Sequence, residues 1–440
     1  MEVTAELQTQ THIGIVGFGD MGRLYANRFF RAGWKNVHVC DIPSKYEAIK
    51  KDTEGSGLHV HRDGYGVVRI SDVVFYSVEA KGIERVVAQF GPAHKPGAVV
   101  SGQTSVKEPE VAAFDRHIPD DVDVVPSHSM HGPNVSPLHQ PLVLIRHRVR
   151  DPRNYDLVKA ILSCLESDFV EGLSYVDHDE ITADTQAATH LAFLSMGIAW
   201  RTMGTFPWEN PLYMGGIENV KVLLTMRIFS SKWHVYAGLA MMNPAAKVQV
   251  REYARSASEL FKLMITGQEE EFRARIQKAG STLFPTGANT NPILLSDSFL
   301  DEFSLSIIPP TKRMPNSHLS LLAMADCWYR LNINPYRHLI CQTPIFRFLL
   351  GITEYLFRNE QMLQDAVNHA VRDPEIRADD FEFCSAARGW VEVVESNNME
   401  AYQSRWEGAT AFFGERLREA NKVSGQLIAK LAKVPPAPQN

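Results

Sequence analysis

Residues 12–22 read His-Ile-Gly-Ile-Val-Gly-Phe-Gly-Asp-Met-Gly, a short apolar run followed by closely spaced glycines, Gly17, Gly19 and Gly22. Such a run predicts a buried parallel strand, and the apolar spacing after it predicts a helix. In a strand–loop–helix unit of this kind the glycines permit a tight turn, close approach of a pyrophosphate and close helix packing. Asp41 lies 24 positions after Gly17, at the end of a second predicted strand, so the pattern predicts a dinucleotide-binding loop.

The residues around Asp41 leave open which nicotinamide dinucleotide is bound. An acidic side chain at this point can accept a hydrogen bond from a ribose 2′-hydroxyl, which favours NAD. Ser44 and Lys45 follow and could hold a 2′-phosphate, which favours NADP. The candidate cofactor-binding residues are Gly17, Phe18, Gly19, Asp20, Met21, Gly22, Asp41, Ser44 and Lys45.

Apolar runs beyond this loop continue the alternation of strands and helices. Further strands are predicted at 37–41, 72–78, 98–101, 123–126 and 141–145. After residue 175 helical spacing dominates, and helices are predicted at 181–195, 223–242, 317–331 and 346–357. The last of these is apolar on all sides, which is typical of a core or subunit-interface helix. The fold class is therefore an α/β N-terminal Rossmann domain followed by an all-α domain.

The same changes of pattern predict the domain boundaries. The prediction is a flexible arm at 1–11, a Rossmann domain at 12–174, a helical domain at 175–430 and a disordered tail at 431–440. Residues 285–315 are rich in Pro, Gly, Asn and Ser, which predicts a long connection inside the helical domain.

The composition of the 440 residues excludes several classes of protein. With 45% hydrophobic and 22% charged residues the chain resembles an ordinary globular protein. A net charge of −6 gives no basic surface, so no nucleic-acid partner is expected. No apolar run reaches the roughly 18–20 residues that a membrane helix needs. Five scattered cysteines without a Cys-x-x-Cys pair, and no secretory signal pattern, predict a cytoplasmic protein.

Two polar loops follow later predicted strands, at the sheet edge where substrates bind in this architecture. The first contains Ser105 and Lys107, and the second contains His128 and His131. An imidazole at His128 can act as a general base near neutral pH. The spacing of His128 and His131 suits metal ligands, but no nearby carboxylate or cysteine completes a site, so no metal is predicted.

Further polar residues lie in the helical part. An Asp-His-Asp run at 177–179 is followed by His190, Arg227 and Tyr236. Each of the last three has a simpler interpretation: a core histidine, a helix ion pair and a packing aromatic residue. Their residue types alone therefore do not decide between structure and binding.

The order of these motifs resembles that of the prephenate dehydrogenase family of tyrosine biosynthesis. The shared order is a glycine-rich loop, Ser-Val-Lys, His-x-x-x-Gly, a His-Asp helix and an Arg-Ile segment, all within residues 12–245. The resemblance is closer to the fungal branch, through the runs at 178–186, 231–238 and 315–321. It implies a Rossmann domain followed by a helical dimerisation domain.

The resemblance also implies an activity and a set of site residues. The activity is oxidative decarboxylation of prephenate to 4-hydroxyphenylpyruvate with NADP, in a homodimer formed through the helical domain. His128 matches the catalytic histidine that contacts the ring hydroxyl, and Ser105 matches the serine that orients it. His190 and Tyr236 match substrate-pocket positions, and Arg227 matches the arginine that anchors a substrate carboxylate.

Two alternative functions remain open. The same fold could oxidise arogenate, which differs from prephenate by an amino group in place of the side-chain ketone. The long helical half also fits a regulatory protein that senses NADP without turnover. The set of Ser105, His128 and Arg227 favours an enzyme, because a sensor needs no base beside the nicotinamide.

Overall fold

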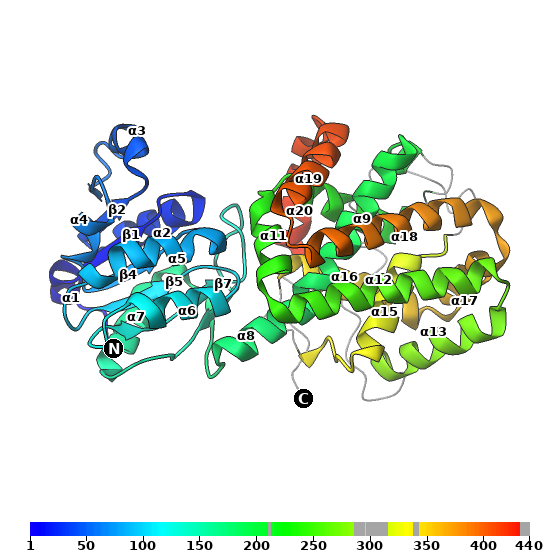
Figure 1. The fold of residues 1–440 in the computed structure, drawn as a ribbon, viewed down its shortest axis with the longest axis horizontal. Helices are drawn as coiled ribbons and strands as arrows, with labels where there is room; N and C mark the ends of the chain where they lie inside the picture. Colours follow the sequence, from blue (N-terminus) through cyan, green and yellow to red (C-terminus); the bar gives the residue numbers. More distant parts are fainter. Residues whose placement is uncertain (210–212, 214, 286–294, 296–315, 338–342, 432–440) are drawn as a thin grey trace. The chain divides into compact units, whose positions relative to one another are not determined.

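The computed structural model describes residues 1–209, 213, 215–285, 295, 316–337 and 343–431. The chain forms two compact units, Met1–Ile181 and Thr182–Asn440, and Figure 1 shows the elements of each. The boundary lies seven residues beyond the predicted end of the Rossmann domain at residue 174. The reason is that helix α8 (Tyr175–Thr182) carries His178 and Asp179, which bond to side chains and backbone of the first unit.

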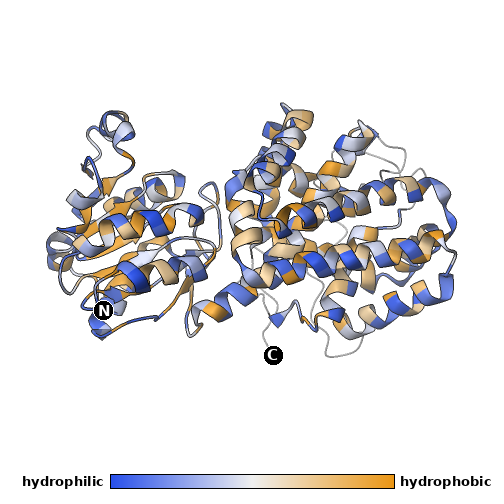
Figure 2. Ribbon diagram, in the orientation of Figure 1, coloured by the Kyte–Doolittle hydropathy of each residue, from blue (hydrophilic) through white to orange (hydrophobic). Residues whose placement is uncertain are grey.

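The first unit is built on a six-stranded parallel sheet with the order β3-β2-β1-β4-β5-β6. The strands are β1 (His12–Val16), β2 (Asn36–Cys40), β3 (His59–Val60), β4 (Val73–Tyr76), β5 (Val99–Gly102) and β6 (Asp123–Val124). Their apolar side chains pack into cores on both faces of the sheet, and the strands are hydrophobic in Figure 2. This strand order confirms the Rossmann fold, in which a ligand binds where the order reverses, beside β1 and β4.

Helices connect the strands and cover both faces of the sheet. They are α2 (Asp20–Arg31), α3 (Tyr46–Asp52), α4 (Gly64–Val68), α5 (Ala80–Phe90), α6 (Glu108–His117) and α7 (Pro152–Leu162). Because α2 begins directly after the glycine loop, the predicted cofactor residues Asp20 and Met21 form its first turn. In sequence order the crossovers between β1, β2, β4, β5 and β6 all return to parallel neighbours, as this fold requires.

A second, three-stranded sheet carries the segment around His128. It consists of β7 (Ser127–Ser129), β8 (Pro141–Leu144) and β9 (Asp168–Val170) in the order β7-β8-β9. Two predictions are wrong here: 141–145 does not join the parallel sheet, and His128 lies in a strand instead of a loop. β7 pairs antiparallel with β8, and the register places His128 opposite Val143. Backbone pairing therefore fixes His128 more firmly than a loop would.

The predicted flexible arm at 1–11 is wrong as well. Residues Ala5–Gln10 form helix α1, whose N-cap is Thr4. Gln8 Nε2 donates to the carbonyl oxygen of Ala32 at 2.7 Å, and Leu7 packs against the core of the first unit. A polar sequence hid this contact, because only one apolar side chain and one amide attach the helix.

The second unit is helical throughout its described residues. Its helices are α9 (Ala188–Met203), α10 (Ile217–Phe229), α11 (Trp233–Met242), α12 (Pro244–Ile265), α13 (Glu269–Leu283), α15 (Leu319–Arg330), α16 (Pro344–Arg358), α17 (Glu360–Arg372), α18 (Pro374–Glu395), α19 (Met399–Phe413) and α20 (Arg416–Leu431). Helix α9 packs on α18, and α12 packs on both α15 and α18 (Figure 1). None of the helices in the described ranges is both long and apolar enough to cross a bilayer.

Some predicted helices differ from the observed ones. The predicted helix at 223–242 is two helices, because the hydroxyl groups of Ser230 and Ser231 bond back to the carbonyl oxygen of Arg227 and end α10. The apolar helix at 346–357 corresponds to α16, whose side chains are buried within the unit itself. Almost all of the predicted connection at 285–315, and the tail from 432 onward, lie outside the described residues.

Buried histidines of the first unit predict a loss of stability in acid. His38 and His94 are 6% and 7% exposed, and burial lowers the pKa of each from 6.5 to about 3. As the pH falls below 6.5 the unfolded chain takes up protons that the folded chain does not bind until about pH 3. We expect urea denaturation to show a free energy of unfolding lower by about 2 kcal/mol per buried histidine at pH 5 than at pH 7.

Two variants make this prediction specific. His94→Gln keeps an amide that can bond the Tyr76 hydroxyl, which lies 2.8 Å from His94 Nε2, but it cannot titrate. It should remove about 2 kcal/mol of the difference between the two pH values. His139→Gln, at a side chain that is 72% exposed, should leave the difference unchanged. An unaltered pH dependence in the His94 variant contradicts the assignment.

Candidate active site

The glycine loop leaves space for a phosphate group. Gly17 has φ of +101°, and a Cβ there would lie 2.2 Å from the carbonyl oxygen of Ser77. A Cβ on Gly22 would lie 2.2 Å from the carbonyl oxygen of Gly17. At Gly19, by contrast, a Cβ would meet no described atom within 4 Å, and this residue caps α2 without a side-chain hydrogen bond. Open space over an uncapped helix N-terminus fits a pyrophosphate.

Asp41 lies beside this loop, just beyond β2. Its Oδ2 accepts a hydrogen bond from the Phe18 N–H at 3.1 Å, and its Oδ1 accepts one from the Ile42 N–H at 2.7 Å. Lys45 Nζ lies 3.2 Å from Oδ1, and its side chain is 55% exposed. Ser44 is exposed in the same turn. Because Lys45 offsets the charge of Asp41, the site can accept a 2′-phosphate as well as a 2′-hydroxyl.

A buried ion pair connects the two polar loops. Lys107 Nζ donates to Glu110 Oε1 at 2.8 Å and to the carbonyl oxygen of Ser127, in β7, at 2.7 Å. Both charged side chains are 0% exposed. Glu110 Oε2 accepts hydrogen bonds from the N–H and hydroxyl of Thr104, at 2.9 and 2.6 Å. Such pairing is what makes a buried charge tolerable, and it fixes the strand that carries His128.

Asp179 caps helix α6 from outside that helix. Its carboxylate accepts hydrogen bonds from the Lys107 N–H at 2.8 and 3.0 Å and from the Glu108 N–H at 2.8 Å. The positive end of a helix dipole stabilises a carboxylate at this position. Asp179 is only 5% exposed, so these contacts hold it as an ionised acceptor inside the first unit.

Asp179, His178 and His128 form a continuous chain of hydrogen bonds. His178 Nδ1 lies 2.8 Å from Asp179 Oδ1, and His178 Nε2 lies 2.8 Å from His128 Nδ1. A carboxylate can only accept, so neutral His178 carries its proton on Nδ1 and accepts through Nε2. His128 must then carry its own proton on Nδ1. This bonding assigns the basic lone pair of His128 to Nε2.

The surroundings of His128 keep it neutral. The residue is 8% exposed, and burial, followed by the charges of His178, Lys107 and His131, lowers its pKa well below 6.5. A neutral imidazole is the form that a general base requires. Nε2 is not one of the fully buried unpaired polar atoms of the described residues, so it remains accessible to a substrate.

Ser105 lies on the connection between β5 and α6 and is half-buried. Within the described part of the chain its hydroxyl group makes no hydrogen bond to His128. The Nδ1 side of His128 is instead bonded to His178, which performs the orienting role that the resemblance gives to a serine. Ser105 could still contact a substrate hydroxyl on the other side of the ring.

In the helical unit His190 and Tyr236 lie together. Their ring centroids are 4.6 Å apart, and with Trp390 and Tyr402 they line an apolar cavity of about 10 Å³. A volume of this size holds about one water molecule. Burial lowers the pKa of His190 to about 3, and its Nδ1 is buried without a hydrogen-bond partner among the described residues. A buried ring nitrogen in this state calls for a polar ligand or an ordered water.

Arg227 is held by neutral partners on helix α20. Its Nη1 lies 3.0 Å from Asn421 Oδ1 and 3.4 Å from Ser424 Oγ. Within the described residues no carboxylate lies within 4 Å of it, so the helix ion pair considered from the sequence is not formed there. Burial lowers the pKa of Arg227, and the nearby Tyr236 opposes this shift. The guanidinium group therefore keeps its capacity to bind a carboxylate.

The roles of His178, Asp179 and Lys107 could not be assigned from the sequence. The Asp-His-Asp run at 177–179 signals an unusual helix start, but His128 lies 50 positions away along the chain. Lys107 belongs to the Ser-Val-Lys motif, which suggests substrate binding, whereas the structure buries it against Glu110. A turn of π-helix at Ala183–Ala187, a feature common at functional sites, joins α8 to the helix that carries His190.

Two family profiles match the chain. Residues 28–146 match the profile described as "Prephenate dehydrogenase, nucleotide-binding domain", and residues 187–433 match one described as a "6-phosphogluconate dehydrogenase C-terminal domain". A Schizosaccharomyces pombe protein named probable prephenate dehydrogenase, with NADP(+) in its name, is 48% identical over 421 residues, covering 95% of this chain and 97% of its own length. The chain belongs to the prephenate dehydrogenase family.

Other members of the prephenate dehydrogenase family agree with this assignment. The Saccharomyces cerevisiae protein named prephenate dehydrogenase, also with NADP(+) in its name, is 46% identical over 424 residues and covers 94% of this chain and 93% of its own length. The A. aeolicus prephenate dehydrogenase, solved with hydroxyphenyl propionate and NAD+, covers 62% of this chain and 97% of its own, with a TM-score of 0.51. At 18% identity this last match supports the fold alone.

Proposed function

We propose that the chain catalyses the oxidative decarboxylation of prephenate to 4-hydroxyphenylpyruvate with NADP+, a step of tyrosine biosynthesis. The two fungal relatives, which align over nearly the whole chain, carry this activity and cofactor in their names. The observation that carries the proposal is the chain from Asp179 through His178 to His128, which leaves a neutral imidazole with Nε2 as its base. A protein that only senses a dinucleotide has no need of such a base.

The chemistry requires a base more than any other protein group. Prephenate carries a 4-hydroxyl on a cyclohexadienyl ring, a ring carboxylate and a pyruvyl side chain. His128 Nε2 accepts the hydroxyl proton while hydride leaves the same ring carbon, and the proton returns to that oxygen as the ring becomes a phenol. The electron pair of the breaking carbon–carboxylate bond enters the ring as carbon dioxide departs. NADP+, when bound, is the hydride acceptor.

The chain of hydrogen bonds stabilises the charge that this step places on His128. Once Nε2 is protonated, the imidazolium still donates from Nδ1 to His178, and Asp179 provides the negative charge at the end of the chain. Asp179 itself keeps its charge through its bonds to the N-terminus of α6. The side chains therefore need no rearrangement when the proton moves.

The remaining site residues are proposed as the binding groups. The glycine loop receives the pyrophosphate, and Asp41, Ser44 and Lys45 receive the adenosine ribose with its 2′-phosphate. Arg227 binds a substrate carboxylate, because its guanidinium group faces only neutral partners in the described residues. His190 and Tyr236 belong to the substrate pocket, and the unpaired Nδ1 of His190 supports this role.

The proposal extends to the assembly and its location. We propose a homodimer formed through the helical unit, and a cytoplasmic enzyme. Exposed apolar side chains on that unit, such as Val235 and Val248, offer contact area for a second copy. Sedimentation at several protein concentrations tests the dimer, and a monomer at all of them would remove this part of the proposal.

The direct test of the activity is a coupled set of rate measurements. Purified protein is mixed with prephenate and NADP+, and the absorbance of reduced cofactor is followed while the product is identified by mass. The same measurement with arogenate distinguishes the two possible substrates. Tight binding of NADP+ without hydride transfer from either substrate would favour the sensor and sink the proposal.

Lys45 should determine part of the preference for NADP+ over NAD+. Lys45→Ala removes a cation beside Asp41 and leaves that carboxylate facing the 2′-phosphate. Because a charge-assisted hydrogen bond to phosphate is lost, we expect KM for NADP+ to rise about tenfold or more while KM for NAD+ changes little. Initial rates with both cofactors measure the effect.

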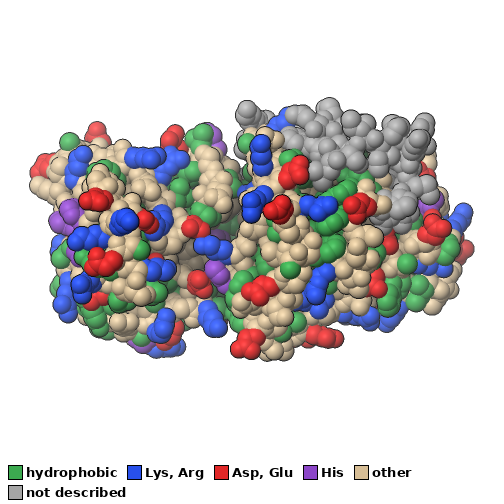
Figure 3. All heavy atoms as spheres, turned by 90° about the horizontal axis from the view of Figure 1, so that it is seen from above, with side chains coloured by type: hydrophobic (Ala, Val, Ile, Leu, Met, Phe, Trp, Pro, Cys, Tyr) green, Lys and Arg blue, Asp and Glu red, His purple; other side chains and the backbone are tan. Residues whose placement is uncertain are grey.

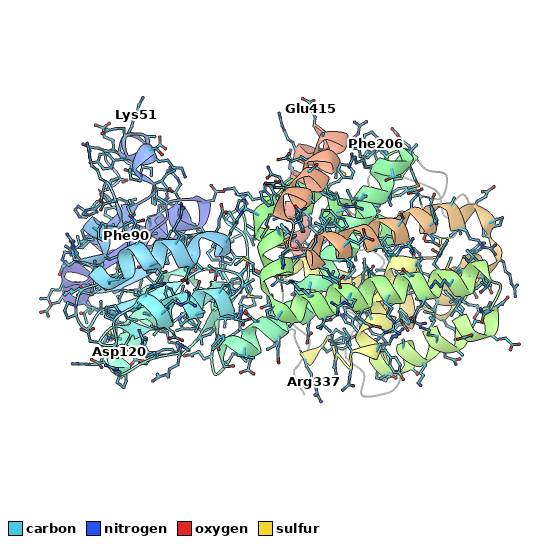
Figure 4. The ribbon with its side chains drawn as sticks, viewed as in Figure 1. Lys51, Phe90, Asp120, Phe206, Arg337 and Glu415 are labelled. Atoms are coloured by element: carbon cyan, nitrogen blue, oxygen red, sulfur yellow. The ribbon has the colours of Figure 1, made fainter. Side chains whose placement is uncertain are left out.

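A matched lysine on the same helix provides the control. Lys51 is exposed at the far end of α3 and is labelled in Figure 4. Lys51→Ala should leave both KM values unchanged. Equal changes in KM for the two cofactors in the Lys45 variant would contradict its assignment to the 2′-phosphate.

A further inference from the structure

The helical unit contains a second polar hollow, separate from the cavity of His190 and Tyr236. Its volume is about 410 Å³, which is within the usual range of small-molecule sites. Helices α9, α18 and α19 form it, and these three helices pack on one another. Its polar lining residues are Thr202, Glu382, Ser385, Arg388, Glu392 and Arg405.

The hollow lies beside three arginines that have no ion-pair partner in the described residues. For Arg201, Arg388 and Arg405 no described carboxylate lies within 4 Å. Other arginines of this unit are paired: Arg275 lies 2.6 Å from Asp326, and Arg330 lies 2.6 Å from Glu252. Partly buried guanidinium groups without a counter-charge are costly unless an anion binds them.

Two glycines position these guanidinium groups against the helices. A Cβ on Gly389 would lie 2.7 Å from Nη2 of Arg405, and a Cβ on Gly408 would lie 2.6 Å from Nη1 of Arg201. Any larger residue at these positions would displace the guanidinium groups. The glycines, on facing helices α18 and α19, therefore make room for two positive charges side by side.

Arg405 is the most enclosed of the three. Its guanidinium carbon lies 5.2 Å from the ring centre of Trp390, and its Nη2 donates to the carbonyl oxygen of Ala386 at 3.3 Å. Its Nε is buried without a hydrogen-bond partner in the described residues. Burial and then the neighbouring Arg201 lower the pKa of Arg405, and the more distant Glu392 opposes them. A donor in this state is one that an oxyanion would satisfy.

We infer that this hollow is a binding site for a small oxyanion, a carboxylate or phosphate group of a ligand other than the substrate. Arg405 and Arg388 provide the charge-assisted hydrogen bonds, and Arg201 adds to the positive potential. Glu382 and Glu392 at the same hollow reduce its net charge, so a singly or doubly charged group fits better than a polyanion. The inference stands on the helical unit alone and does not depend on the proposed activity.

Calorimetric titration with inorganic phosphate and with malonate tests the inference. NADP+ is kept at saturation so that phosphate cannot enter the dinucleotide site. We expect saturable binding by the full-length protein, and a Kd at least tenfold weaker for Arg405→Gln. Stronger binding of phosphate identifies a phosphate-bearing ligand, and stronger binding of malonate identifies a carboxylate ligand.

Three further variants keep the test specific. Arg405→Lys retains a charge and should recover part of the affinity. Gly389→Ala retains every charge, but its Cβ displaces the guanidinium group of Arg405, so affinity should still fall. Arg416→Gln removes a guanidinium group stacked 3.9 Å from the ring centre of Phe206, labelled in Figure 4, and should leave binding unchanged.

Two outcomes overturn the inference. The first is an Arg405→Gln protein that binds both anions as tightly as the unaltered protein. The second is an unaltered protein that shows no saturable binding up to about 10 mM of either anion. If Arg405→Gln instead changes the sedimentation of the protein without any anion binding, the arginines serve a contact between subunits and the site does not exist.

Discussion

Replacing His128 by asparagine should lower kcat by about 10²–10⁴-fold while the affinity for NADP+ stays unchanged. The reason is that Nε2 of His128 is the basic nitrogen, its Nδ1 being bonded to His178 at 2.8 Å. Asparagine preserves a polar side chain of similar reach but cannot take up a proton at neutral pH. Stopped reactions with prephenate measure kcat, and fluorescence titration with NADP+ measures cofactor binding.

The same substitution at an exposed histidine serves as the control. His139 precedes β8, its side chain is 72% exposed, and its φ of +56° is one that asparagine adopts readily. His139→Asn should therefore retain both stability and turnover. A His128→Asn enzyme with near-normal kcat would remove this residue from the mechanism, whatever its effect on cofactor affinity.

Asp179→Asn should lower kcat by about 10²-fold through the tautomer of a residue that it does not touch. An amide can turn its NH₂ group toward His178 Nδ1, which then accepts and moves its proton to Nε2. His128 would answer by placing its own proton on Nε2, and the base would be lost. Asp179 also caps α6, so we expect a loss of stability of about 1–2 kcal/mol in parallel.

The pH profile separates this effect from simple destabilisation. Activity requires neutral His128, whose pKa burial holds well below 6.5, so kcat/KM of the unaltered enzyme should stay level through pH 6.5 and fall only below it. In Asp179→Asn the imidazolium loses its distant counter-charge, so the acidic limb should move to lower pH. An unmoved limb, with activity lost only in proportion to the unfolded fraction, would leave Asp179 a purely structural role.

The neighbouring carboxylate on α8 is the matched control for Asp179. Asp177 is exposed, and its Oδ2 accepts hydrogen bonds from the N–H and the hydroxyl of Ser174, at 2.9 and 2.6 Å. Asp177→Asn should change neither kcat nor the position of the acidic limb. The two aspartates differ only in what they contact, so the comparison isolates the hydrogen-bond chain to His128.

Charge is distributed over both units in a way that makes these contrasts meaningful. In the space-filling view Lys, Arg, Asp and Glu side chains intermingle over the visible face (Figure 3). Most such surface ion pairs contribute little, because water and salt screen them. The pairs expected to matter are the buried ones, Lys107 with Glu110 and His178 with Asp179, where removal of one partner leaves the other unsatisfied.

The dinucleotide loop and the Rossmann strand order could be predicted because their signals are local. Gly17, Gly19 and Gly22 are required by contacts within one strand–loop–helix unit, and apolar runs mark strands buried on both faces. The predicted loop around His128 was wrong because β7 pairs with β8, which lies further along the chain, and alternation over so short a strand gives no signal. Helix α1 was missed for a related reason, since its attachment depends on one residue from a distant turn.

The sequence by itself determined the Rossmann fold, the helical second half, the glycine loop and the choice of His128 as the base. Each depends on a short-range pattern or on the order of motifs along the chain. Only the tertiary structure decided which nitrogen of His128 is basic, because that depends on His178, 50 positions further along the chain, and on the Asp179 carboxylate bonded to it. The same holds for the arginines around Gly389 and Gly408: lack of a counter-charge is a property of three-dimensional surroundings, which no spacing along a sequence can record.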